Sequence, residues 1–298
     1  ALVGLLVGTH TDDEIAKLFD PEYLRWELAK EQGLWHKVKR LGFHQSIDFN
    51  ETLATRDRLI PDLTFQEAFD RTGRHISVTV APADHHQSSR LLNAVTSPNV
   101  YCREAMIASC ALPFYFPPAK LAAKNVQGER QPYLPTKSWI DGSVSEDLPT
   151  KRLSRLYGVN HYIVSQINPV AVPFIKRNTD SYAMTKLTHA GQNIVKELIN
   201  AGTALLDRPM SKLPTVGNFY RVLSSVALQD YTGDINILPP TRLIHPKHIM
   251  SHKSVEEMLE LIEAGERATW PEIERIRVQT KVSKTLDSIL KRMEDYTI

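Results

Sequence analysis

Segments of strand and helix character alternate along this chain of 298 residues. The stretch Ile76–Ala81 is β-branched and alternates apolar with polar residues, which is typical of a strand. A second strand-type stretch covers 161–167, and helix-type stretches cover 102–112 and 149–157. This alternation predicts an α/β fold with a mostly parallel sheet and helices on both of its faces. In such sheets, functional groups collect in the loops at the strand ends.

Two threonines mark expected helix starts. Thr11 stands before a run of acids, and Thr64 is followed three residues later by Glu67, which is the spacing of a capping box. The apolar stretch 1–8 is too short for a bilayer span, which takes ~20 apolar residues, so it predicts a buried helix. Residues 120–136 are polar, and we expect them to form an insertion.

Composition and charge exclude several classes of protein. Hydrophobic residues make up 42% of the chain and charged residues 23%, which is ordinary globular usage and argues against disorder. The net charge of +2, without a block of basic residues, argues against a nucleic-acid partner. Cys102 and Cys110 flank a helix-type stretch, which would hold them about 12 Å apart, too far for a disulfide. Unpaired thiols favour a cytoplasmic location.

A search for common catalytic and ligand-binding motifs leaves few candidates. His245, His248 and His252 have the spacing of metal ligands on one helix face, but Pro246 disfavours a helix there and flanking lysines would repel a cation. We therefore expect no metal site. Neither a G-x-S-x-G nucleophile elbow nor a glycine-rich phosphate loop occurs in the chain.

Asp141 is the remaining candidate. An Asp-Gly pair is common at turns, because Asp can accept a hydrogen bond from its own backbone and Gly tolerates unusual backbone angles. Trp139 and Ile140 give the carboxylate an apolar approach that would desolvate it. Gly142 would let another backbone or a substrate come close. Taken alone, these residues favour a turn over a catalytic site.

The blocks around Asp141 resemble the patatin-like phospholipases, most closely the branch of triacylglycerol lipases and lysophospholipid acyltransferases. The resemblance runs in order over most of the chain. It rests on residues 64–74, 91–100, 105–118 (AMIASCALPFYFPP), 139–149 (WIDGSVSEDLP), 231–239 and 265–271.

The resemblance implies a three-layer α/β/α sandwich around a mostly parallel central sheet, with a Ser-Asp catalytic dyad. The family's Asp lies in a D-G-[G/A/S] turn, which Asp141-Gly142-Ser143 matches. It therefore implies a catalytic role for Asp141, supported by Gly142 and Ser143. It also makes Ala111-Leu112-Pro113 a candidate lining for an acyl channel, with plain core packing as the equally good interpretation. Neither cofactor nor metal is implied.

Two family motifs are missing from the sequence. The glycine-rich oxyanion loop and the G-x-S-x-G elbow do not occur, whereas residues 1–14 match the helix and G-T-x-T-D-E-E stretch that follow the elbow in the family. We therefore expect the chain to begin just after the elbow, without the nucleophile and the N-terminal strands, and to be inactive on its own. Residues 1–240 are then the C-terminal part of a patatin-like catalytic domain. Residues 241–298 form a helical extension, interrupted near Gly265 and Pro271.

The function implied by the resemblance is hydrolysis of lipid acyl esters, of the triacylglycerol lipase or phospholipase type. The expected partners are an acylglycerol or phospholipid substrate and a lipid surface. The aromatic-rich segment Trp26–Trp35 is a candidate contact for that surface, with a buried helix face as the somewhat favoured alternative. The protein would be cytoplasmic or peripheral at a membrane or lipid droplet. Two alternatives stay open: a non-catalytic module that binds a lipid surface or a protein, and an acyltransferase that uses a lysolipid as acceptor.

Overall fold

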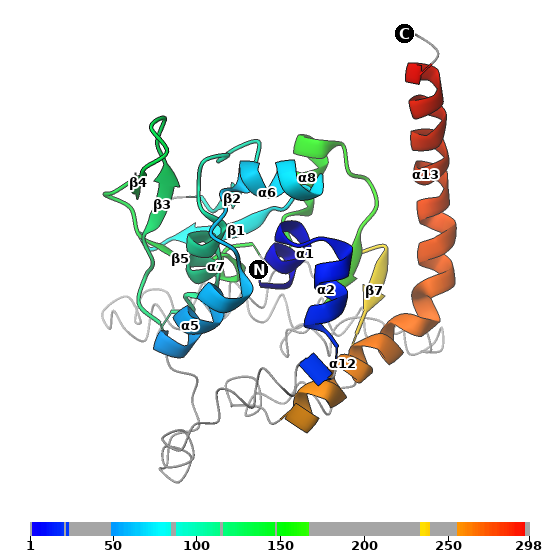
Figure 1. Cartoon of the computed structure of the whole chain (residues 1–298), viewed down its shortest axis with the longest axis horizontal. Coiled ribbons are helices and arrows are strands. Elements are labelled where there is room, and N and C mark those ends of the chain that lie inside the picture. Colours follow the sequence, from blue (N-terminus) through cyan, green and yellow to red (C-terminus); the bar gives the residue numbers. More distant parts are fainter. Residues whose placement is uncertain are drawn as a thin grey trace, which may run out of the picture.

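The computed structural model of the chain describes residues 2–20, 22–23, 49–84, 88–113, 116–146, 148–166, 233–238 and 255–295. Helices and short strands alternate through them, as Figure 1 shows. The helices are α1 (Leu2–Thr9), α2 (Asp12–Leu18), α5 (Phe49–Leu59), α6 (Phe65–Thr72), α7 (Cys102–Cys110), α8 (Thr150–Tyr157), α12 (Val255–Thr269) and α13 (Ile273–Asp295), with 3-10 turns η1 (Gly142–Val144) and η4 (Trp270–Glu272). The strands are β1 (Val78–Pro82), β2 (Arg90–Leu92), β3 (Leu121–Lys124), β4 (Arg130–Tyr133), β5 (Trp139–Asp141), β6 (Ile163–Ser165) and β7 (Ile235–Ile237).

The strand that was expected at 76–81 is the centre of a three-stranded sheet. β1 pairs with β2 on one side and with β5 on the other, and both pairings are antiparallel. The parallel order expected from the sequence occurs, among the described strands, in the pair β6–β7. β1 and β2 pair antiparallel because the connection between them, from Pro82 to Arg90, is short, and a parallel crossover takes a dozen or more residues.

The core lies between the three-stranded sheet and helix α7. This helix packs against β1, β5, β3 and α5, and α1 packs on both α6 and α7. Trp139, Phe65 and Leu5 are among the largest fully buried side chains. The apolar N-terminal stretch is a helix as predicted, but only one of its faces is buried, since Val3 and Val7 are exposed. Cys102 and Cys110 are free thiols, also as predicted, and burial raises the pKa of Cys102 to about 12.

Both threonine caps form as the sequence predicts. The Thr64 hydroxyl accepts a hydrogen bond from the Glu67 N–H at 3.2 Å, and a Glu67 carboxylate oxygen accepts one from the Thr64 N–H at 2.8 Å. Thr11 forms the same reciprocal pair with Glu14 at the start of α2. Each box satisfies backbone donors that the first turn of a helix leaves without an intrahelical partner.

We expect Thr64→Ala to lower the free energy of unfolding by about 1 kcal/mol, because a buried helix start loses its cap. Urea denaturation followed by circular dichroism measures the change. Thr11→Ala is the matched control, since it removes the same kind of box from the exposed helix α2, and its effect should be smaller. Equal effects at both threonines would contradict the assignment of Thr64 to the packed core.

One prediction of local structure was wrong, and one segment has structure that was not predicted. The polar residues 120–136, expected to form an insertion, form a hairpin of β3 and β4, and the Leu121 side chain on β3 is buried in the core. The pairing of β3 with β4 was not predicted, because β4 is polar and exposed and shows no apolar alternation. The predicted interruption near Gly265 is absent, since α12 continues through it, whereas the one at Pro271 is confirmed by η4. A single glycine costs a helix only about 1 kcal/mol relative to alanine.

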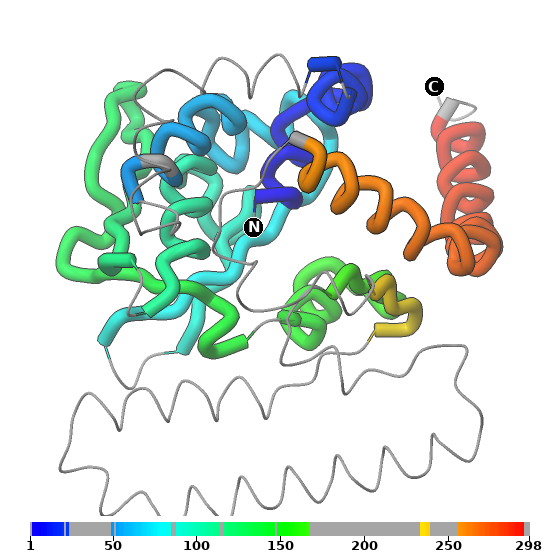
Figure 2. Tube along the Cα trace, turned by 90° about the horizontal axis from the view of Figure 1, so that it is seen from below, coloured from blue at the N-terminus to red at the C-terminus, as the bar shows by residue number. Residues whose placement is uncertain are grey.

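The C-terminal helices lie at one side of the molecule. Figures 1 and 2 show α12 leading to α13, which extends beside the body, away from the three-stranded sheet. Among the residues that the structure describes, none of the helices is both long and apolar enough to cross a membrane.

Candidate active site

Asp141 is the last residue of β5, at the point where the strand passes into the turn η1. Its N–H donates a hydrogen bond to the carbonyl oxygen of Ala111 at 3.0 Å, and Val80 on β1 is its partner across the sheet. Ala111 directly follows α7. The backbone of Asp141 is therefore held between the C-terminal end of α7 and the central strand.

The Asp141 carboxylate caps the turn that follows it. Its Oδ1 accepts a hydrogen bond from the Ser143 N–H at 2.8 Å, so the backbone-bonded turn expected from the residues is present. The side chain is half-buried at a strand end. The geometry is that of a turn and also of an acid presented at the edge of a sheet, which is where α/β proteins place reactive groups.

Gly142 lies directly against the neighbouring strand. A Cβ atom at this position would lie 2.3 Å from the carbonyl oxygen of Thr79 and 2.5 Å from its carbonyl carbon. Both atoms belong to the backbone and cannot turn aside as a side chain can, so only glycine fits at this position. The prediction that Gly142 allows a close backbone approach is confirmed, and the approaching backbone belongs to β1.

Arg152 joins the segment after η1 to the start of β2. Its Nε lies 2.9 Å from Oε2 of Glu146, and its two Nη atoms donate to the carbonyl and hydroxyl oxygens of Ser89, each at 2.7 Å. The Glu146 N–H in turn donates to the carbonyl oxygen of Gly142 at 2.9 Å. Arg152 therefore braces the Asp141 turn through Glu146. The sequence predicts the helix that carries Arg152, but nothing in it identifies Ser89 as a partner.

If Arg152 positions the turn and the full-length protein has the ester-hydrolase activity that the resemblance implies, Arg152→Gln should lower kcat about 3- to 10-fold with little change in KM, because small displacements of a reactive group are costly. Steady-state kinetics on a soluble acyl ester measures both constants. Arg155→Gln is the control, since Arg155 lies on the exposed face of the same helix. A variant at Arg152 that behaves like the Arg155 variant would show that the brace has no role in turnover.

The structure brings part of the predicted acyl-channel segment next to Asp141. Ala111 is fully buried and binds the Asp141 backbone through its carbonyl, while Leu112 and Pro113 are half-buried. Ala111 thus packs as a core residue, and a channel lined by these three residues stays a prediction.

Cys110 is a neighbour of Asp141 that the sequence did not identify. Burial raises the pKa of its thiol, and the negative charge of Asp141 acts in the same direction. The thiol is therefore in its neutral, weakly nucleophilic form at neutral pH. Sequence reasoning treated Cys110 only as a disulfide candidate, because its closeness to Asp141 depends on how α7 packs against β5.

Other predicted candidates are not placed by the structure. The three histidines at 245, 248 and 252 and the aromatic segment Trp26–Trp35 lie outside the described residues. Within the described ranges, no group of three or more His, Cys, Asp or Glu side chains could hold a metal ion.

Comparison with known proteins identifies the family. The family model for patatin-like phospholipases matches residues 1–153, just over half of the chain, and this region contains the Asp141 turn. The chain belongs to the patatin-like phospholipase family. No solved structure matches it significantly.

Relatives in fungi and plants carry lipase names. The chain is 33% identical to triacylglycerol lipase 4 of Saccharomyces cerevisiae, over 93% of this chain and 32% of the relative. It is 30% identical to triacylglycerol lipase SDP1L of Arabidopsis thaliana, over 95% of this chain and 36% of the relative. For triacylglycerol lipase ptl3 of Schizosaccharomyces pombe the identity is 33%, over 72% of this chain and 44% of the relative. The chain thus spans 32% to 44% of the length of these three relatives.

Proposed function

We propose that the protein hydrolyses lipid acyl esters, as a triacylglycerol lipase or phospholipase, with Asp141 as the Asp of a Ser-Asp dyad. The observation that carries the proposal is the Asp141-Gly142-Ser143 turn at the end of β5, inside the region that matches the family. The lipase names of the relatives support the choice of substrate class. The family's three-layer sandwich and the division into a catalytic part at 1–240 and an extension at 241–298 belong to the same proposal.

The proposed chemistry uses the serine that the family carries in a G-x-S-x-G elbow, a motif that does not occur among these 298 residues. The serine oxygen attacks the ester carbonyl, and the Asp141 carboxylate takes the serine proton. Asp141 then gives this proton to the leaving alcohol, and the acyl group stays on the serine. In the second half, Asp141 takes a proton from water, whose oxygen attacks the acyl-enzyme, and Asp141 then returns the proton to the serine oxygen as the fatty acid leaves. Backbone N–H groups stabilise the negatively charged oxygen in both halves.

The local geometry supports Asp141 as the proton acceptor. Its backbone is fixed by Ala111 and its carboxylate by the Ser143 N–H, so the side chain is held in a defined orientation, as positioned catalysis requires. The helix α1, which we expect to follow the nucleophile elbow, packs on α7, and α7 ends beside Asp141. This packing supports a serine placed near the start of α1. The half-buried Leu112 and Pro113 are candidates for the lining of the acyl channel.

Assays of the full-length protein test the proposal. With emulsified triacylglycerol and with phospholipid vesicles as substrates, we expect release of free fatty acid, measured by mass spectrometry of the lipid products. A lysolipid added as acceptor separates the two chemistries, because an acyltransferase would convert it to a diacyl lipid. Absence of both products with every substrate would contradict the proposal and favour a non-catalytic module.

A further inference from the structure

Helix α13 carries a stripe of exposed apolar side chains, which we call the α13 stripe. Its members recur at intervals of four, four, three and four residues and therefore lie along one face of the helix. Their side chains are 43–64% exposed. The stripe consists of Val278, Val282, Leu286, Ile289 and Met293, with Leu290 beside it.

The base of the helix is anchored, and the stripe begins just beyond the anchor. Arg275 donates a hydrogen bond to Oε2 of the buried Glu272 at 2.8 Å and another to the carbonyl oxygen of Asp234 at 3.1 Å. These bonds tie the first turn of α13 to η4 and to the start of β7. Further along, α13 extends beside the body (Figures 1 and 2). The stripe is thus presented on a fixed arm of the molecule.

The spacing of the stripe fits a flat surface better than a second helix. Val278 and Ile289 are eleven residues apart, and so are Val282 and Met293. An eleven-residue repeat is close to the period of a straight helix, so the stripe runs along the axis for about 22 Å. A coiled-coil heptad would include Val282, Leu286, Ile289 and Met293, but it would leave Val278 outside the seam and put Arg275 and Gln279 at the preceding core positions.

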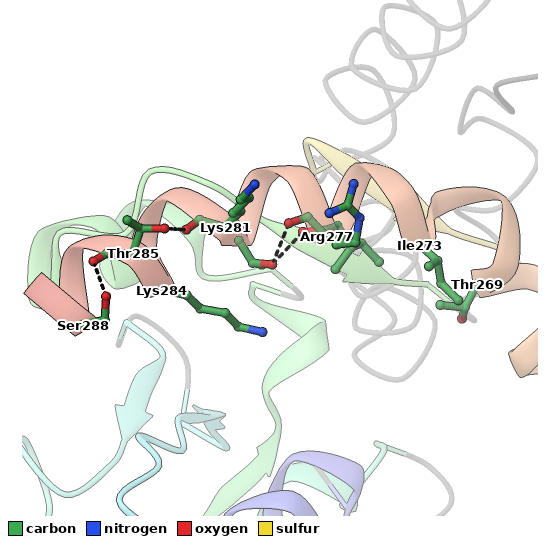
Figure 3. A pocket seen from close by; sticks show the side chains of 9 residues that line it. Thr269, Ile273, Arg277, Lys281, Lys284, Thr285 and Ser288 are labelled. Carbon is green, nitrogen blue, oxygen red and sulfur yellow. Dashed lines mark hydrogen bonds between the residues drawn. The ribbon is translucent and has the colours of Figure 1, made fainter.

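The polar side of α13 is basic. Between residues 281 and 292 the helix carries four basic side chains and one acidic one. A hollow of about 640 Å³ follows this side, and Figure 3 shows Lys281, Lys284 and Arg277 along it. Arg277 is paired with Glu274. Over the whole of α13, six basic and four acidic side chains leave a net charge of +2, which complements an anionic surface. The hollow is lined by Thr269, Ile273, Ile276, Arg277, Thr280, Lys281, Lys284, Thr285 and Ser288.

We propose that α13 binds the surface of an anionic phospholipid layer, with the α13 stripe inserted among the acyl chains and Lys281, Lys284 and their basic neighbours at the headgroups. An exposed apolar face combined with a basic polar face is the pattern of helices that lie in a lipid interface. The inference deepens the proposed function and rests on it for its biological purpose, because acylglycerols and phospholipids are reached at such surfaces. Binding itself requires no turnover.

Flotation of the full-length protein with lipid vesicles tests the inference. We expect binding to phosphatidylcholine vesicles that contain phosphatidylserine, weaker binding without phosphatidylserine, and a further loss at high salt. The double variant Val282→Asp, Leu286→Asp should bind about tenfold more weakly. Val126→Asp is the matched control, since Val126 is 99% exposed at the tip of the β3–β4 hairpin, and it should bind like the wild type.

A charge variant and a folding control make the test decisive. Lys281→Glu combined with Lys284→Glu should remove the preference for phosphatidylserine while keeping the stripe. Circular dichroism melts of all variants should agree with the wild type, because every changed side chain is exposed. Unchanged flotation of the Val282/Leu286 variant would overturn the proposal. So would light scattering that shows a dimer dissociated by this variant, because a second copy would then cover the stripe.

The outcome is separable from that of the proposed function. The Val282/Leu286 variant should hydrolyse a soluble short-chain ester normally and lose activity only on vesicles or emulsions. If neither the wild type nor any variant hydrolyses an ester, but the Val282/Leu286 variant binds vesicles more weakly than the wild type, the proposed function fails and the inference stands. If hydrolysis is normal but the Val282/Leu286 variant floats with vesicles as the wild type does, the inference fails and the proposed function stands.

Discussion

Asp141→Asn is expected to lower kcat for a soluble acyl ester by about 10²–10⁴-fold, the usual contribution of a general acid–base group. The amide cannot accept the serine proton, so both halves of the proposed reaction lose their base. KM should change little, because the carboxylate is proposed to act on the serine and on water rather than to bind the lipid. Steady-state kinetics of the purified full-length protein measures both constants.

The fold should survive this substitution. An Asn side chain has almost the same shape, and its carbonyl oxygen can accept the hydrogen bond from the Ser143 N–H that Asp141 accepts at 2.8 Å. The bond from the Asp141 N–H to Ala111 is made by backbone and is unaffected. A thermal melt close to that of the wild type would therefore separate loss of chemistry from loss of structure.

Asp70→Asn is the matched control for Asp141→Asn. Asp70 is a carboxylate on α6 that accepts a hydrogen bond from Gln66 one turn earlier on the same helix. The chemical change is identical, and we expect activity to remain at the wild-type level. Turnover by the Asp141 variant comparable to that of this control would exclude Asp141 from the dyad.

Gly142→Ala is expected to destabilise the fold by about 1–3 kcal/mol, the usual cost of an added atom in a packed site. The new methyl group would lie 2.3 Å from the Thr79 carbonyl oxygen, and the obstacle is backbone rather than a flexible side chain. Either β1 or the β5–η1 junction must move. Since Asp141 is the neighbouring residue, we expect activity to fall together with stability. Urea denaturation of the two proteins measures the change in unfolding free energy.

Gly265→Ala separates the steric effect from a general effect of replacing glycine. Gly265 lies within α12, and a Cβ atom there would meet nothing within 4 Å. Alanine is the better helix former, so this variant should be unchanged or more stable by about 0.5–1 kcal/mol. A Gly142→Ala protein as stable as the wild type would show that β1 can yield at no cost, which contradicts the packing described here.

Local structure was predictable wherever the signal is carried by neighbouring residues. The capping box at Thr64 was visible because Glu67 is only three residues away, and β1 because its residues alternate. The hairpin at 121–133 was not, because β4 is recognised by its pairing with β3 and not by its own polar residues. The antiparallel order of β1 and β2 follows from the short connection between them, which the prediction of a mostly parallel sheet did not take into account.

The family and the Asp-Gly-Ser motif can be recognised from the amino-acid sequence alone. Asp141-Gly142-Ser143 and the ordered blocks around it are strings of adjacent residues, and they can be read without knowing what lies opposite them. The three-dimensional packing, in contrast, is what places Gly142 against Thr79 and lets Arg152 reach Ser89, 63 residues away. It also decided that the α13 stripe is exposed rather than buried. These features depend on how elements distant in the chain pack together, and a local pattern of residues carries no record of that packing.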